Sequence, residues 1–164
     1  DGQRLIMADR FNNRVLIWNS LPGDNSAPNI VLGQKDFTSN SPGKSLDKLN
    51  WPGAAATDGK KLAVADTYND RLLIWNSFPL SNGQPADIEI KDGGRGPEAN
   101  PKRDMEWPWA VWTDGKKIVA TPTRNSKVLI WNSFPTKNNQ PCQVGHVNPK
   151  GRKKIEPSVE IPVK

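Results

Sequence analysis

The sequence has little of the chemistry on which most catalytic and metal sites depend. It contains one histidine and one cysteine among 164 residues, so an intrachain disulfide is excluded and histidine-based or thiol-based catalysis has few groups to use. His146 follows Cys142 by four positions, a spacing that without further ligands does not define a metal site. Neither a phosphate-binding loop nor a Gly-x-Ser-x-Gly pattern is present.

Long hydrophobic and helical segments are also missing. No stretch approaches the roughly 18–20 apolar residues of a membrane-spanning helix, so we expect no membrane span. Fifteen prolines and 13 glycines interrupt the chain, and no segment keeps a 3.6-residue apolar period. Seven tryptophans nevertheless supply large apolar side chains for a core. The sequence therefore predicts an all-β protein.

One segment occurs three times at nearly equal spacing. The apolar run 15–18, followed by Asn-Ser-Leu-Pro, returns at 72–75 and 128–131, where Asn-Ser-Phe-Pro follows. Each run ends in a tryptophan, and we expect all three to serve the fold: Trp18, Trp75 and Trp131. A repeated unit of this size cannot bury its apolar face alone, so the copies should stack on one another.

Each complete copy predicts four short strands joined by turns, which is the pattern of one β-propeller blade. An Asp-Gly pair marks a tight hairpin turn in every copy, at 1–2, 58–59 and 114–115. The copies span approximately 1–50, which lacks its first strand, 51–106 and 107–154. Residues 155–164 form a tail that we interpret as a candidate closing strand.

The copies resemble the NHL repeat of β-propellers. In that repeat Pro-x-Ala precedes Asp-Gly, the next strand ends in Ala-Asp-(x)2-Asn-x-Arg, and an apolar strand follows. The motif stands here at 8–14 and 65–71. The resemblance covers nearly the whole chain, although the unit is longer than a common NHL blade. It implies four-stranded blades, of which this chain supplies three, or half of a six-bladed ring.

Two residues of the motif change together in the third copy. Pro122 replaces the aspartate that the other copies have as Asp9 and Asp66, and Lys127 replaces the arginine at the positions of Arg14 and Arg71. Joint loss is expected if Asp and Arg form a hydrogen-bonded pair within each blade, because losing one partner leaves the other charge unpaired. We therefore interpret both pairs as structural.

Three blades cannot close a propeller ring, and open sheet edges expose unpaired backbone groups. Two copies could join head to tail into a six-bladed ring, or further blades could lie in sequence outside this chain. In either case we expect the 18.2 kDa chain not to behave as an isolated compact monomer.

Ligands of propellers bind at the mouth of the central channel, beside the innermost strands. The candidate residues there are Asn50, Trp51, Glu106, Trp107, Trp109 and Trp112. Strand alternation predicts that Trp107 and Trp109 share one face and Trp112 takes the other. Packing between blades and a stacking platform for sugars, bases or cations are both open interpretations.

Three functions remain open. The scarcity of catalytic groups favours a non-catalytic binding or scaffold module for a protein, peptide or glycan. The alternative is an enzyme, because the enzymatic propellers that share this shape are metal-dependent hydrolases or lyases. Such an enzyme would use a metal cofactor, for which calcium is the candidate. Some NHL domains bind single-stranded RNA, and the net charge of +6, with basic residues at 116–127 and 150–154, is compatible with a nucleic-acid partner. Asp at position 1 and the Trp- and Asn-rich composition favour a secreted or periplasmic protein.

Overall fold

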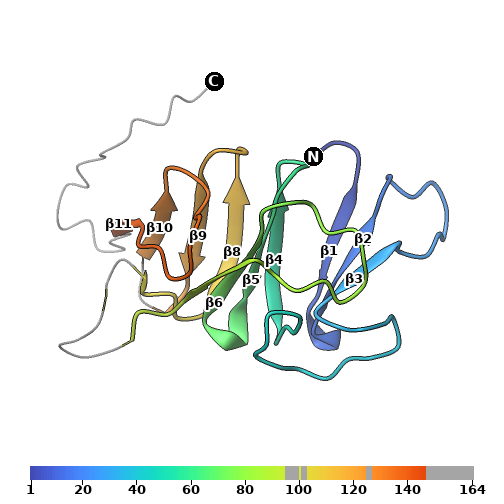
Figure 1. Cartoon of the computed structure of the whole chain (residues 1–164), viewed down its shortest axis with the longest axis horizontal. Coiled ribbons are helices and arrows are strands. Elements are labelled where there is room, and N and C mark those ends of the chain that lie inside the picture. The colour runs from blue at the N-terminus through green and yellow to red at the C-terminus, as the bar shows by residue number, and fades with distance from the viewer. Residues whose placement is uncertain (95–99, 101–102, 125–126, 147–164) are drawn as a thin grey trace.

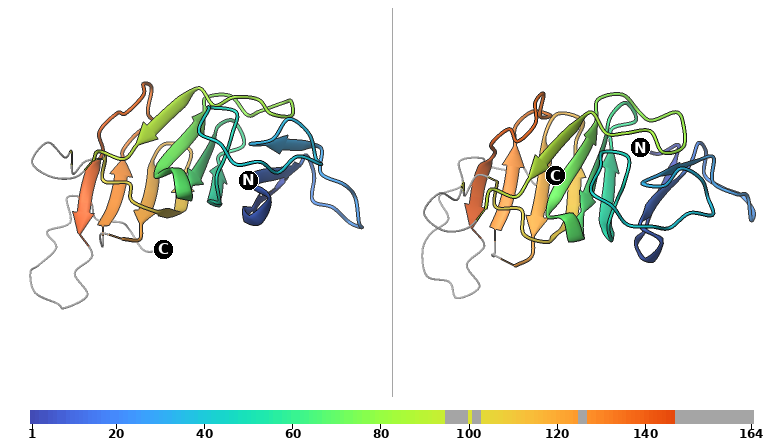
Figure 2. Two further views of the ribbon diagram at one scale, coloured as in Figure 1. Left: turned by 90° about the horizontal axis from the view of Figure 1, so that it is seen from below. Right: turned by 60° about the horizontal axis from the view of Figure 1, so that its bottom comes forward.

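The computed structural model describes residues 1–94, 100, 103–124 and 127–146. These residues form three antiparallel sheets that lie side by side in chain order (Figure 1 and Figure 2). The predicted all-β class and repeated sheet architecture are confirmed, and within the described residues every sheet is open. The described part contains no helix long and apolar enough to cross a membrane. The basic segment 150–154 and the tail 155–164 lie outside the described residues.

The strands follow one another as antiparallel neighbours in each sheet. The first sheet contains β1 (Leu5–Asp9), β2 (Arg14–Trp18) and β3 (Ile30–Leu32). The second sheet contains β4 (Pro52–Thr57), β5 (Leu62–Asp66), β6 (Arg71–Trp75) and β7 (Ile88–Lys91). The third sheet contains β8 (Pro108–Thr113), β9 (Ile118–Pro122), β10 (Lys127–Trp131) and β11 (Gln143–His146). Short 3-10 turns, η1 (Arg10–Asn12) and η2 (Thr67–Asn69), join β1 to β2 and β5 to β6.

The repeated sequence gives a repeated strand register. Trp18 lies opposite Leu5, Trp75 opposite Leu62, and Trp131 opposite Ile118, at the same place in each sheet. The expected Asp-Gly turns are present, with Gly59 and Gly115 at φ of +86° and +87°, a conformation that glycine adopts without steric cost. The three sheets are thus copies of one local structure.

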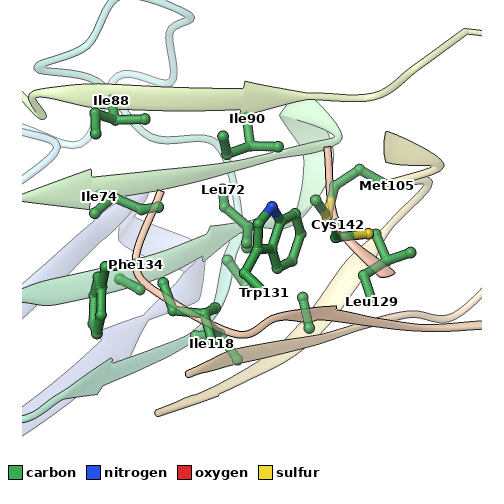
Figure 3. Close-up of a cluster of buried hydrophobic side chains, with 14 residues drawn as sticks. Leu72, Ile74, Ile88, Ile90, Met105, Ile118, Leu129, Trp131, Phe134 and Cys142 are labelled. Carbon is green, nitrogen blue, oxygen red and sulfur yellow. The ribbon is translucent and has the colours of Figure 1, made fainter. Parts of the chain in front are cut away.

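The core consists of two layers, each between neighbouring sheets, and Figure 3 shows the second of them. The first layer joins the first and second sheets: Val15, Ile17, Ile30, Leu32, Leu49, Leu62, Val64, Leu73, Trp75, Phe78 and Ala86. The second layer joins the second and third sheets: Ala63, Ala65, Leu72, Ile74, Ile88, Ile90, Met105, Val111, Ile118, Ala120, Leu129, Trp131, Phe134 and Cys142. Side chains alternate along β5, so this strand contributes to both layers.

The three repeated tryptophans occupy equivalent positions with unequal burial. Each donates its indole N–H to a carbonyl oxygen of the loop that follows: Trp18 to Ser26 (2.7 Å), Trp75 to Gln84 (3.1 Å) and Trp131 to Gln140 (2.9 Å). Trp75 and Trp131 are 1% and 2% exposed, whereas Trp18 is only half-buried. Burial is complete only where a described sheet covers the tryptophan.

The structure contains both aspartate–arginine pairs. Arg14 Nε lies 2.7 Å from Asp9 Oδ2, and Arg71 Nε lies 2.7 Å from Asp66 Oδ2. The side chains of Arg71 and Asp66 are 2% and 0% exposed, against 17% and 19% for Arg14 and Asp9. In the third sheet Lys127 pairs instead with Asp104, a partner that the repeat pattern does not predict.

Arg71 makes more contacts than the motif predicts. Its guanidinium also donates to Glu89 Oε1 (2.7 Å) and to three carbonyl oxygens of the connection before β4, those of Lys44 (2.6 Å), Ser45 (3.1 Å) and Lys48 (2.9 Å). A buried charge needs hydrogen bonds of this kind to offset the loss of water. Arg71 therefore fixes a long loop as well as a strand pair.

Loops also cover the outer edges of the first two sheets. Asn82 Oδ1 accepts the backbone N–H of Val31 in β3 (3.0 Å), and the N–H of Gly83 donates to the Val31 carbonyl (2.8 Å). On β7, Asn138 and Asn139 similarly accept backbone N–H groups, both at 2.9 Å. Each outer strand is thus paired by the loop of the next sheet, which protects an edge that could otherwise pair with another chain.

Replacing a fully buried repeated tryptophan should be costly. We expect Trp75→Ala to lower the free energy of unfolding by about 3–5 kcal/mol, because a large buried side chain and its hydrogen bond are lost together. Trp109→Ala is the control, since Trp109 is 40% exposed, and it should cost less than about 1 kcal/mol. Guanidinium denaturation followed by far-UV circular dichroism measures both, and equal losses would contradict the described burial.

The two aspartate–arginine pairs should differ in energetic importance. Arg71→Met leaves the Asp66 carboxylate buried without its cation, so we expect a loss of about 3–5 kcal/mol at neutral pH. Arg14→Met, at the more exposed pair, should cost clearly less.

The same variant has an expected pH dependence. Burial raises the pKa of Asp66, against the opposing effect of Arg71 and of hydrogen bonds from Asn50, Asn69 and Arg71, so removing Arg71 should raise it further. A raised pKa in the folded state favours folding at low pH and loses this effect as the pH rises. The penalty of Arg71→Met should therefore be smaller at about pH 5 than at about pH 7.5. If the loss of unfolding free energy caused by Arg71→Met grew as the pH fell, the buried Asp66 carboxylate would not be the source of the penalty.

Candidate ligand-binding face

The turns η1 and η2 and the segments that enter β4 and β8 lie at one end of the sheets, the lower end in Figure 1. Four aromatic side chains from these segments form a continuous row, which we call the aromatic column: Phe11, Trp51, Tyr68 and Trp107. It runs from the first sheet across the second to the third.

The column alternates between two kinds of position. Trp51 lies between Phe11 (centroids 4.9 Å apart, interplanar angle 73°) and Tyr68 (4.5 Å, 16°). Trp107 follows Tyr68 at 5.1 Å between ring centroids, and the Arg124 guanidinium also lies over the Trp107 ring, 4.3 Å from its centroid. Trp51 and Trp107, which directly precede β4 and β8, therefore each contact residues from two successive turns.

The turn residues of the column are equivalent in the repeat. Phe11 and Tyr68 both follow the motif aspartate by two positions, and Arg124 follows Pro122 by the same interval. The sequence analysis named Trp51 and Trp107 but missed these three residues. The signal was present as an aromatic residue between the Asp and Asn of the motif in both copies that carry the motif.

Both column tryptophans have an unusual backbone conformation. Their φ angles are +52° for Trp51 and +53° for Trp107, in the left-handed region that bulky residues rarely adopt, and each precedes a proline. Asn13 Oδ1 accepts the N–H of Trp51 (3.0 Å), and Asp70 Oδ1 accepts the N–H of Trp107 (2.8 Å). The same device thus holds the strained residue in both copies.

The column tryptophans differ from the core tryptophans in the hydrogen bonding of their indole N–H groups. Trp18, Trp75 and Trp131 all donate to a carbonyl oxygen, whereas Trp51 and Trp107 have no side-chain hydrogen bond within the described residues. Both are half-buried, and neither indole nitrogen is enclosed without a partner. Their N–H groups are therefore accessible donors.

The column exposes aromatic surface beside a cation. Tyr68 and Trp107 each contact two neighbours through their rings, while Phe11 is 76% and Tyr68 40% exposed. The guanidinium of Arg124 lies over the ring of Trp107 and brings a positive charge to the same surface. The face thus combines apolar area with hydrogen-bond donors.

The prediction for Trp109 was wrong in one respect. A bulge between Pro108 and Ala110 interrupts the alternation of β8, so Trp109 is exposed and belongs to neither core layer. Its ring lies under the Arg10 guanidinium of the first sheet, at 4.0 Å. Trp107 precedes β8 and shares no strand face with it. A Cβ at position 53 would come within 2.6 Å of the Trp109 carbonyl oxygen, which explains the glycine there.

The other predicted site residues have separate places. Trp112, 54% exposed, lies near the far end of β8 and does not join the column. The side chain of Glu106 pairs with Arg124 at 3.3 Å. Asn50 contributes through its backbone: its N–H donates to Asp66 Oδ1 (2.7 Å), and its carbonyl accepts from the N–H of Tyr68 (3.1 Å).

Acidic and basic side chains nearly balance in the described part of the chain, so most of the positive excess lies outside it. Among the described residues, no group of three or more His, Cys, Asp or Glu side chains lies close enough together to hold a metal ion. With this geometry established, comparison with protein-family models and with curated proteins found no match.

The hydrogen bond that holds Trp107 can be tested directly. We expect Asp70→Ala to reduce the near-UV circular dichroism of the column and to cost about 1–3 kcal/mol, because it leaves the Trp107 N–H without an acceptor. Asp70→Asn should retain the signal, since Asn13 performs this role before Trp51. Loss of the signal in both variants would show that the acceptor oxygen is not what orders the ring.

Proposed function

We propose that this chain is a non-catalytic binding module and that a protein or peptide ligand docks on the aromatic column. The observation that carries the proposal is a row of partly exposed aromatic residues whose indole N–H groups have no hydrogen-bond partner among the described residues. Tryptophan, tyrosine and arginine are the residues most enriched at the energetic centres of protein interfaces. Carbonyl or carboxylate oxygens of a ligand can accept hydrogen bonds from the free donors.

We also propose that the three sheets are blades of an NHL-like β-propeller. Successive sheets pack face to face through equivalent positions, and β4 contacts both β1 and β8. In such an arrangement the aromatic column lies beside the innermost strands, where propellers bind their ligands. The repeat motif at 8–14 and 65–71 supports the same family.

A peptide fits the column better than a flat ligand does. A sugar or base that stacks needs an open ring face, and Tyr68 and Trp107 each already contact two neighbours through their rings. Aromatic surface and N–H donors suit the mixed apolar and carbonyl surface of an extended peptide. The near balance of charge on the described residues gives no independent support to an RNA ligand.

Peptide selection tests the proposal. A phage-displayed random peptide library selected on the immobilised chain should yield peptides whose dissociation constant rises at least about tenfold with Phe11→Ala or Tyr68→Ala, because the energy of an interface concentrates in few residues. Leu80→Ala is the matched control, since Leu80 is 83% exposed in the loop at the opposite end of the second sheet. Its variant should bind like the parent chain.

Two outcomes would replace this function by another. If the chain bound only oligosaccharides on a glycan array, the column would be a glycan site. If it bound single-stranded RNA with an affinity that fell steeply with salt, phosphate contacts would dominate. Selected peptides that bound equally well to the Tyr68→Ala variant would remove the column from the binding site.

A further inference from the structure

The first and third sheets each have one apolar face that no described sheet covers. On the first sheet Met7 is 43% exposed, and it points away from Ile6, which packs against the first core layer. On the third sheet Trp112 is 54% exposed, and it points away from Val111, which belongs to the second core layer. Exposed apolar area of this kind marks an interaction surface.

These two open faces are the two halves of a contact that the chain already makes twice. Met7 and Trp18 stand at the positions of Val64 and Trp75, with which the second sheet packs against the first. Ile130 of the third sheet stands at the position of Ile74, with which the second sheet packs against the third. The open face of the third sheet therefore corresponds to one side of the internal contact and that of the first sheet to the other.

The edge contacts have the same unfilled counterparts. Asn25 stands in the loop after β2 at the place of Asn82 and Asn138, and within the described residues its exposed side chain makes no hydrogen bond. At the other end of the chain, β11 is the outer strand of the third sheet, and no described segment pairs with its outer edge. The side-chain oxygen of Asn25 can thus accept a backbone N–H from the outer edge of β11, as Asn82 does for β3.

A contact between a basic side chain of one sheet and an aromatic ring of the next sheet also repeats along the chain. Arg4 lies 4.1 Å from the ring centroid of Phe78, and Lys61 lies 4.6 Å from that of Phe134, each reaching from one sheet to the next. Lys117 stands in the third copy at the position of Arg4 and Lys61. Leu21 stands in the first copy at the position of Phe78 and Phe134, and it is 64% exposed. The alkyl stem of a lysine packs on leucine as readily as on an aromatic ring.

We propose that the open face of the third sheet packs against the open face of the first sheet in a second copy of this chain. Both complementary faces, the free edge and the free asparagine belong to one polypeptide, so a second copy supplies every missing partner. The contact is head to tail, and in a pair of chains it forms twice about a two-fold axis, which encloses six sheets. Trp18 then becomes as buried as Trp75 and Trp131.

Two charged variants of the full chain test this contact by light scattering after size exclusion. The parent chain should have about twice the mass of 18.2 kDa, while Met7→Asp and Trp112→Asp should each raise the dissociation constant at least about tenfold. A mixture of the two variants should associate again, because the Met7→Asp chain keeps an intact third sheet and the Trp112→Asp chain keeps an intact first sheet. Leu80→Asp is the control for an exposed charge elsewhere and should leave the mass unchanged.

The alternatives give different results. If like faces paired, one of the two variants would dimerise normally and mixing would restore nothing. A parent chain that stays monomeric at every concentration would overturn the proposal, and it would point to an occupant within the same chain, such as 147–164. Far-UV circular dichroism confirms that each variant is folded. Asn25→Ala, which leaves both apolar faces intact, should weaken the dimer by a smaller factor.

Discussion

The packing of one sheet on the next is the constraint on which the rest of the structure depends. In the second sheet, which has a neighbour on each side, every residue of β5 and β6 is buried. In β1, which has a described neighbour on one side only, no residue is fully buried. A sheet that is apolar on both faces is stable in water only between two others. The repeat of the sequence is therefore a repeat of interfaces as much as of strands.

The buried ion pair of the second sheet links this core to the candidate binding face. Asp66 accepts hydrogen bonds from Arg71 and from the backbone N–H of Asn50, the residue before Trp51. Arg71 in turn binds the loop that leads to Asn50. A polar pair within the core thus sets the position at which the chain enters β4, and with it the placement of Trp51 in the column.

Patterns that recur along the chain could be predicted from the sequence, whereas contacts between the three repeats could not. Register, turns and the pairing of Asp66 with Arg71 follow from local motifs, so they could be predicted. The exposure of Trp109 depends on a bulge in β8 that recurs at the equivalent place in β4, between Pro52 and Ala54, and strand alternation alone does not reveal it. Phe11 and Tyr68 carried a signal in their shared motif position, but their stacking with tryptophans of the following segment is a tertiary contact.

The pairing of Lys127 with Asp104 has the same cause. The lysine was visible as a departure from the motif. Its new partner lies in the connection before β8, the counterpart of the connection before β4 that Arg71 binds, but it offers a carboxylate where Arg71 finds a carbonyl oxygen. Substitution of the motif pair in the third sheet therefore did not abolish an ion pair at this place but changed its chemistry. An arginine can bind several carbonyl oxygens at once, whereas a lysine acts as a single point charge.

The backbone of the column tryptophans indicates why the column exists in this form. A non-glycine residue in a sparsely populated backbone region costs about 1–3 kcal/mol, and glycine would occupy positions 51 and 107 without that cost. The contacts that the indole rings make therefore offset this backbone strain. Their rings join successive sheets through Phe11, Tyr68 and Arg124, while their N–H groups have no hydrogen-bond partner in the described part of the chain. A purely structural role explains the stacked faces but not the unpaired donors, since each core tryptophan has its N–H bonded to a carbonyl oxygen. The column thus joins successive sheets, and its ordered rings and N–H donors are the features on which the proposed binding function depends.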